Sequence, residues 1–408
     1  MKRMRTAVRS SSGEASQSVR LAMLIVMVGV VSALHVGKLP PAIPVLSDRL
    51  GLGLVQGGFL LSIIQLAGMT LGAVAGTVAD RMGPRRIMLI GLLLLAGGSF
   101  MGATASTPAL LLLTRAIEGM GFLMAVLPAP VLLRRLIHEP GALQKGLGFW
   151  GAYMPVGTAL ALLSGPLAYQ WMGWRLSWVM LGVLVMACAW AVWTRIPADR
   201  HDHTSAAAPV FLGLKATLSA PGPWLVALAF LVYSGQWLAV VGFLPTIYTQ
   251  AGWSVAWIGP LTALAAGVNL IGNIAAGRLL AMGLSPATLL WSGYGVMATG
   301  AFFAFSGWMP AVGQYVAVLL FSAVGGLIPG TLFTLAVHFA PSGQTVTTTV
   351  GWVQQLSSLG QFASPPLVAW MATVVGGWQL TWVFNVLCCL CGAWFAWRLQ
   401  LRWRVRKR

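Results

Sequence analysis

The sequence predicts an all-α membrane protein of twelve transmembrane helices, arranged as two similar six-helix halves. Hydrophobic residues make up 58% of the 408 positions and charged residues 8%, which lies outside the composition of soluble globular domains. Apolar stretches of roughly 20 residues, the length that crosses a hydrocarbon layer, recur along the chain with short polar breaks. A weak internal repeat divides the chain into two halves. Lipid is therefore the main solvent of this protein.

The predicted spans fall into two groups of six. The first group comprises residues 21–46, 54–79, 86–104, 108–136, 145–171 and 174–195. The second group comprises residues 223–249, 254–281, 285–305, 309–339, 345–373 and 377–401. The resulting domains are a cytoplasmic tail (1–20), an amino-terminal six-helix bundle (21–196), a polar cytoplasmic central loop (197–222), a carboxy-terminal six-helix bundle (223–401) and a basic cytoplasmic tail (402–408).

The internal repeat is clearest where the sixth and twelfth spans begin. The segment Gly173–Trp178 returns as Gly377–Trp382, an offset of 204 residues (377 minus 173), with four of the six positions identical. At the same offset Pro41–Ile43 recurs as Pro245–Ile247. Two parallel six-helix repeats are typical of transporters in which the substrate binds between the halves. Channels and membrane enzymes require no such repeat.

The basic residues report topology rather than a nucleic-acid partner. The chain has 25 Lys and Arg residues and a formal charge of +18. If both termini are cytoplasmic, all of these residues lie on the cytoplasmic side except Lys38, Arg49, Arg115 and Arg175. This asymmetry follows the positive-inside rule. We therefore expect a multi-pass protein of the inner (plasma) membrane with both termini in the cytoplasm, membrane lipids as partners and no nucleic-acid partner.

The sequence gives no indication of a metal site, a disulfide or a cofactor. Cys188, Cys388, Cys389 and Cys391 lie inside apolar spans, without His or carboxylate residues at ligand spacing. The spans also contain no paired carboxylates and no nucleophile with a nearby base. We therefore expect a protein that is not an enzyme.

The break between the second and third spans carries the most specific motif. Residues 76–86 read Gly-Thr-Val-Ala-Asp-Arg-Met-Gly-Pro-Arg-Arg. This segment resembles the major facilitator superfamily signature GxLaDRxGrk, although Val78 stands in place of the usual Leu. The resemblance implies a conformational switch in which Asp80 lies against the amino-terminal end of a helix in the other half. The switch residues would be Gly76, Asp80, Arg81, Gly83 and Arg85. The alternative is that these charges only set the topology.

Further segments support this resemblance and refine it. Residues 112–121 are similar to the family's fourth-helix pattern lxxRxxqGxg, with Glu118 where glutamine is usual. Residues 151–157 fit the fifth-helix antiporter pattern gxxxGPxxGG poorly, which puts efflux by antiport in doubt. Residues 130–135 and 243–248 resemble segments of the cyanate-permease branch.

Four ionisable residues lie at membrane depth: His35, Lys38, Arg115 and Glu118. Each is a functional candidate, because a charge at this depth costs several kcal/mol. A rise of about 1.5 Å per residue places His35 and Arg115 at a similar level, and the spacing i, i+3 places each pair on one helix face. Three potential cations against one carboxylate predict a binding site for a small anion such as a carboxylate. Glu118 and His35 are also the candidates for proton coupling.

An alternative interpretation leaves these residues without a substrate. In that interpretation Arg115 pairs only with Glu118, Lys38 extends to the outer headgroups, and His35 bonds a backbone carbonyl.

Neutral polar side chains at mid-depth are further candidates for substrate binding. They are Tyr153, Ser234, Gln236, Trp237, Gln354 and Gln355. Contact with the substrate and contact between helices are both consistent with the sequence at these positions.

These observations together predict a secondary active transporter that moves a small, anionic solute by alternating access, in an uptake reaction coupled to protons or to another gradient. The alternatives are an exporter of drugs or metabolites with the same fold, and a channel or receptor-like membrane protein. We expect the protein to act as a monomer.

Overall fold

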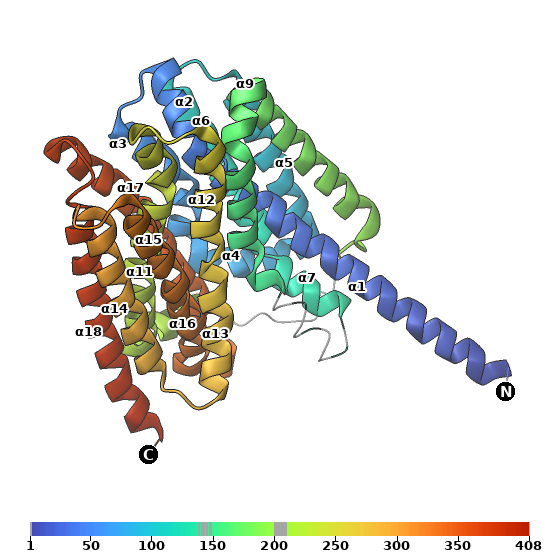
Figure 1. The fold of residues 1–408 in the computed structure, drawn as a ribbon. Helices are drawn as coiled ribbons and strands as arrows, with labels where there is room; N and C mark the ends of the chain where they lie inside the picture. Colours follow the sequence, from blue (N-terminus) through green and yellow to red (C-terminus); the bar gives the residue numbers. More distant parts are fainter. Residues whose placement is uncertain are drawn as a thin grey trace.

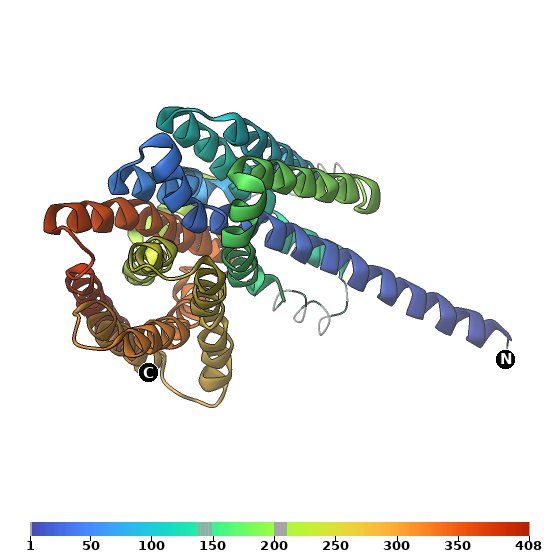
Figure 2. The same cartoon turned by 45° about the horizontal axis from the view of Figure 1, so that its top comes forward.

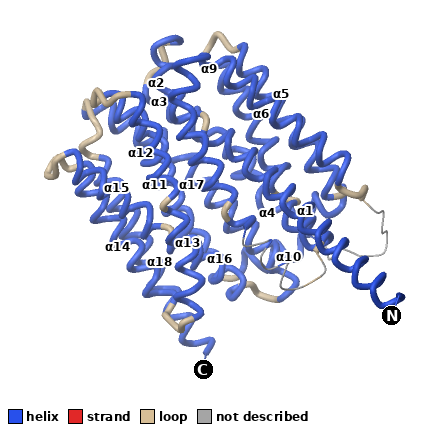
Figure 3. The backbone as a smooth tube through the Cα atoms, turned by 45° about the vertical axis from the view of Figure 1, so that its right-hand side comes forward, coloured by secondary structure: helices blue, strands red, loops and turns tan. Residues whose placement is uncertain are grey.

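Long helices make up the protein, and the described residues contain no β-strand (Figure 3). The computed structural model describes residues 2–137, 139, 143, 146, 149–199 and 210–407. Side chains are described throughout this part except at residues 2–18, 75–82, 210–211, 344 and 404–407. Both chain termini lie at the same end of the helices, the lower end in Figure 1.

The first half contains the helices that correspond to predicted spans one to six. They are α1 (Lys2–Gly37), α2 (Leu39–Leu50), α3 (Leu54–Ser62), the 3₁₀ turn η1 (Ile63–Gln65), α4 (Leu66–Met82), α5 (Pro84–Thr104), α6 (Pro108–Val126), α7 (Ala129–Leu136) and α9 (Tyr153–Arg195). Prolines explain two of the breaks, because proline lacks the N–H that continues a helix. Pro40 and Pro41 follow the break between α1 and α2, and Pro128 and Pro130 flank the start of α7.

The second half contains α10, which precedes span seven, and the helices that correspond to spans seven to twelve. They are α10 (Val210–Ser219), α11 (Pro221–Gln250), α12 (Val255–Gly267), α13 (Asn269–Ala281), α14 (Pro286–Phe305), α15 (Ala311–Gly325), α16 (Leu327–Phe339), η2 (Gly343–Thr345), α17 (Val346–Val375) and α18 (Thr381–Lys407). Helix α10 lies within the predicted central loop. The Thr217 hydroxyl of α10 is 3.3 Å from the Thr349 hydroxyl of α17. Residues 200–209 of this loop lie outside the described residues.

The predicted all-α membrane fold is confirmed, and within the described residues each predicted span coincides mainly with helix. Ten helices in the described part of the chain are long and apolar enough to cross a membrane. One of them, α9, contains residues 153–171 of the fifth predicted span and the whole of the sixth. Helix α17 is not among the ten, because its Gln, Ser, Thr and Pro residues lower its mean hydropathy. Helix α1 already begins at Lys2 and α18 continues to Lys407, so the predicted tails are helical extensions of the terminal spans.

The two halves pack side by side, the first in blue to green and the second in yellow to red (Figure 2). Helices α3 and α4 pack against α17, α2 packs against α11, and α9 packs against α12. Small residues permit this approach: a Cβ on Gly58 would meet the backbone of Pro365 and Pro366, and one on Gly72 would meet Gln355. The interface between the halves is therefore formed mainly along α17.

The turn inside α9 depends on one glycine. Gly173 has φ 75° and ψ 160°, a conformation that is open almost exclusively to glycine. It separates the fifth predicted span from the sixth, and an added Cβ at this position would meet no neighbouring atom. Any cost of substitution at Gly173 therefore comes from the backbone alone.

We expect Gly173→Ala to lower the free energy of unfolding by about 1–3 kcal/mol, because alanine has no favourable conformation at these angles. Gly97→Ala is the matched control, since Gly97 lies within α5 and an added Cβ also meets nothing there. Thermal unfolding of the purified protein in detergent measures both variants. Equal midpoints for the two variants would contradict the role assigned to Gly173.

Candidate functional site

The four ionisable residues at membrane depth come together inside the first half. His35 lies in the last turn of α1, and Lys38 is the single residue that links α1 to α2. Arg115 and Glu118 lie on α6 at spacing i, i+3 and so share one face of that helix. Each of these side chains is at most 1% exposed. We refer to these four residues as the ion cluster.

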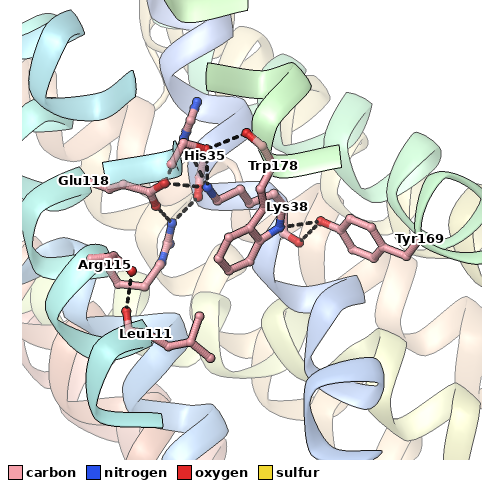
Figure 4. A network of polar contacts seen from close by, with 9 residues as sticks. His35, Lys38, Leu111, Arg115, Glu118, Tyr169 and Trp178 are labelled. Carbon is pink, nitrogen blue, oxygen red and sulfur yellow. Dashed lines mark hydrogen bonds and ion pairs between the residues drawn. The ribbon is translucent and has the colours of Figure 1, made fainter. Parts of the chain in front are cut away.

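Glu118 is the centre of the ion cluster (Figure 4). One carboxylate oxygen, Oε1, lies 2.5 Å from Lys38 Nζ and 3.3 Å from His35 Nδ1. The other, Oε2, accepts a hydrogen bond from Arg115 Nη1. Arg115 Nη1 also donates to the backbone carbonyl of His35, over 2.8 Å. The carboxylate therefore joins α6 to the joint between α1 and α2.

Three residues that sequence reasoning missed complete the surroundings of Lys38. Its ammonium donates to Ser99 Oγ of α5 over 3.0 Å and lies 4.2 Å from the centre of the Trp178 ring. Tyr169 donates to the Lys38 carbonyl over 2.6 Å. Cation–π contact and hydrogen bonding together compensate for the loss of water around the ammonium. Ser99 lies in a run of small residues and the two aromatic residues in apolar spans, so sequence alone contained no signal for them.

The geometry contradicts part of the alternative interpretation from the sequence. The pair between Arg115 and Glu118 is present, as that interpretation requires. Lys38, however, points inward to Glu118 and is 1% exposed, so it does not extend to the headgroups. His35 Nδ1 faces Glu118 and Lys38 rather than a backbone carbonyl. The nearby carboxylate offers Lys38 a closer partner than the headgroup layer.

The ion cluster carries an excess of positive charge and unused donors. Lys38 and Arg115 contribute two positive charges and Glu118 one negative charge, which leaves +1 when His35 is neutral. Glu118 is the one buried carboxylate among the described side chains. Arg115 Nε, Arg115 Nη2 and His35 Nε2 are buried and have no hydrogen-bond partner in the described part of the chain. Such groups are costly unless a partner is supplied.

The neutral polar candidates lie elsewhere, and most bind other helices. Ser234 donates to the Ser357 carbonyl over 2.9 Å, and Trp237 donates to Ser322 Oγ over 3.1 Å. Tyr153 stacks on Trp150, with ring centres 4.4 Å apart. The contacts of Ser234 and Trp237 join helices within the second half, whereas the contact of Tyr153 is local in the chain.

The three glutamines among these candidates differ in their hydrogen bonds and in their exposure. Gln355 accepts a hydrogen bond from the backbone N–H of Ala73 in the other half, over 2.9 Å. Gln236 is buried and accepts from Cys389 Sγ over 3.3 Å, while its Nε2 has no partner among the described residues. Gln354 is exposed. Substrate contact at any of these positions remains a prediction.

A polar cluster between the halves was also missed by sequence reasoning. Gln65, in η1, donates to Gln361 Oε1 of α17 over 3.0 Å and accepts from Ser358 over 3.2 Å. A glutamine within each of two apolar spans was the available signal. Side-chain hydrogen bonds of this kind join helices across the interface and can exchange partners when the halves move.

The signature loop is held by contacts within the first half. Gly83, with φ 90°, ends α4 and precedes α5. The Asp199 carboxylate accepts from the backbone N–H groups of Arg85 and Arg86 and pairs with Arg135 at 2.8 Å. A carboxylate at a helix amino terminus is stabilising.

Two further observations concern the predicted switch residues. The Arg85 guanidinium donates to the Trp193 carbonyl over 2.6 Å and so joins this loop to α9. Gly76 lies in α4, but the side chains of Asp80 and Arg81 lie outside the described residues. The predicted contact of Asp80 with the other half therefore stays a prediction.

Two six-helix halves that pack along α17, with a charged cluster buried within one of them, define the class of polytopic membrane transporters. The family model of the Major Facilitator Superfamily matches residues 25–350. The chain belongs to this superfamily and is a transporter of a small-molecule substrate rather than an enzyme. The resemblance that the signature loop indicated is thus confirmed.

Comparison with known proteins identifies relatives with different substrates. The chain is 24% identical to the cyanate transport protein CynX of Escherichia coli K12 over 384 residues, 90% of this chain and 93% of CynX. It is 27% identical to the multidrug resistance protein MdtH of Yersinia enterocolitica over 225 residues, 55% of each chain. It is 35% identical to the puromycin resistance protein pur8 of Streptomyces alboniger over 135 residues, 33% of this chain and 27% of pur8.

Solved structures show the same fold. A bacterial homologue of the human lysosomal transporter Spinster, in an inward-facing and occupied conformation, matches with a TM-score of 0.75. The match covers 94% of this chain and 96% of that one at 15% sequence identity. An unoccupied structure of a bacterial Spinster homologue matches with a TM-score of 0.73 at 16% identity.

We expect Glu118→Gln to lower the free energy of unfolding by about 3 kcal/mol or more, because it leaves Lys38 and Arg115 buried without a carboxylate. Lys38→Met in the same chain should recover part of this loss, since the double variant restores the net charge of +1. Thermal unfolding of the two single variants and the double variant forms a double-mutant cycle. Strictly additive effects would show that Lys38 and Glu118 do not interact.

Proposed function

We propose that the protein carries a small anion into the cell together with protons, and that the ion cluster contains the anion site. The single observation that carries this proposal is the buried excess of positive charge beside the unpartnered donors of Arg115 and the unpartnered Nε2 of His35. A bound anion would neutralise the excess charge and also accept hydrogen bonds from the donors. None of the described residues does both.

The relative that aligns over most of this chain supports an anion as the substrate. CynX, which aligns over 90% of this chain, is a transport protein for cyanate, and cyanate is a small anion. The contact of His35 Nδ1 with Glu118 at 3.3 Å supports proton coupling, because a proton can pass between groups at this distance. Glu118 and His35 are therefore the proposed coupling residues.

Alternating access would proceed by movement of one half against the other. The ion cluster lies wholly in the first half, so it would move as one body with α1, α5, α6 and α9. The contacts that must change lie between the halves, at Gln65 with Gln361 and at Ala73 with Gln355. The distribution of basic residues supports an inner-membrane location with both termini in the cytoplasm.

A second candidate function is export of drugs or metabolites. The similarity to pur8 and MdtH, which are resistance proteins by name, favours it. Transport assays in right-side-out and inverted membrane vesicles separate the two functions. Accumulation of labelled cyanate or acetate in right-side-out vesicles supports uptake, whereas accumulation only in inverted vesicles supports export.

We expect Arg115→Gln to abolish accumulation of labelled cyanate and acetate, because the variant removes both the charge and the donors of the proposed site. Arg278→Gln is the control, since Arg278 is exposed at the end of α13. The amount of protein in the membrane is measured in parallel. Undiminished uptake by Arg115→Gln would overturn the proposed anion site.

A further inference from the structure

The Arg115 guanidinium forms hydrogen bonds through Nη1 but none through the edge that carries Nε and Nη2. We call this second edge the unused edge. Arg115 Nη1 donates to Glu118 Oε2 and to the His35 carbonyl. Its Nε and Nη2 are buried and have no hydrogen-bond partner in the described part of the chain. The guanidinium is planar, so the two bonds at Nη1 also set the direction in which the unused edge points. This edge is held in place before any ligand arrives.

The unused edge has the geometry of an oxyanion receptor. In a guanidinium, the N–H of Nε and one N–H of Nη2 lie in the plane of the group and point in parallel along one edge. Two parallel donors of this kind bind the two oxygens of a carboxylate at once. A linear anion presents one atom at its end and meets only one of the two donors well. The shape of the edge therefore favours a planar anion with two adjacent oxygens.

The other cation of the cluster has no donor to spare. Lys38 has three N–H groups. They face Glu118 Oε1 at 2.5 Å, Ser99 Oγ at 3.0 Å and His35 Nδ1 at 3.4 Å. Lys38 therefore compensates Glu118 and leaves recognition of a ligand to Arg115.

The charge of the cluster sets the charge of the ligand. Lys38 and Arg115 against Glu118 leave +1. A monoanion brings the sum to zero, whereas a dianion would leave one buried negative charge without a partner, which is costly. Glu118 is the one buried carboxylate among the described side chains and already binds the opposite side of Arg115. Among the described residues, no group accepts a hydrogen bond from the unused edge.

We propose that the Nε–Nη2 edge of Arg115 is the specificity element of this transporter and selects a small planar monoanion of the carboxylate type. This inference rests on the proposed function, since it assigns the chemical class of the anion bound in the ion cluster. Glu118 and the His35 carbonyl are positioning groups that orient the guanidinium.

Binding of three anions to the purified full-length protein in detergent tests this assignment. The probes are acetate, which is planar and monovalent, cyanate, which is linear and monovalent, and sulfate, which is tetrahedral and divalent. Isothermal titration or the shift of the thermal midpoint gives the dissociation constants. We expect acetate to bind at least about tenfold more tightly than cyanate, and sulfate to bind most weakly.

Arg115→Lys provides the matched variant, because it keeps the positive charge and removes the two parallel donors. We expect its affinity for acetate to fall by about tenfold or more while its affinity for cyanate changes less. Arg278→Lys, outside the cluster, should bind both anions as the wild type does. If Arg115→Lys does not fold, the order of the three anions in the wild type still decides.

The possible outcomes separate this inference from the proposed function. Two outcomes would show that the unused edge is not the specificity element: equal affinity of the wild type for acetate and cyanate, or an Arg115→Lys variant that keeps the wild-type preference. Neither outcome would contradict anion transport. A wild-type protein that binds none of the three anions overturns both.

Discussion

The burial of Glu118 between two cations is the constraint on which the first half of this protein depends. A charge within a membrane-spanning helix costs roughly 3 kcal/mol or more unless it is paired. Lys38 and Arg115 supply that pairing, and each can do so only because its own helix stands where it does. The side chain of Lys38 must leave the α1–α2 joint in the direction of Glu118, and Pro40 and Pro41 help to set the backbone there. Ser99 of α5 and Trp178 of α9 must also lie beside the Lys38 ammonium. The Glu118 carboxylate thereby joins α6 to the α1–α2 joint, and the contacts of Lys38 add α5 and α9.

This constraint makes the two halves unequal although they share an internal repeat. The first half is joined internally by ionic contacts. Within the described side chains, the second half is joined by neutral contacts, such as Asn269 with the Ser322 carbonyl and Tyr233 with Asn269. At the offset of 204 residues, Ser322 stands where Glu118 stands in the first half (322 minus 118). Among the described side chains, buried charge is thus confined to one side of the interface, and neutral hydrogen bonds of α17 span it. Such a division suits a carrier whose site stays in one half while the contacts between the halves change.

The superfamily fold explains how the protein moves a solute and leaves open which solute it moves. Its relatives include a cyanate carrier and two resistance proteins, so fold and family alone do not choose among substrates. The choice has to come from the site. The proposed site offers the Nε–Nη2 edge of Arg115 beside the pair of Lys38 and Glu118, which would suit a small oxyanion better than a large apolar drug.

The sequence by itself determined the membrane class, the positions of the helices and the list of buried charges, because lipid imposes these on each segment separately. Every span must be about 20 apolar residues long and must satisfy its own backbone, and every ionisable residue inside it stands out. Only the tertiary structure decided which groups meet. Lys38 could have reached the headgroups, and its inward direction follows from the position of Glu118, 80 residues away. Ser99, Tyr169 and Gln65 acquired their roles in the same way, since a neutral polar residue has no partner until distant helices pack against it.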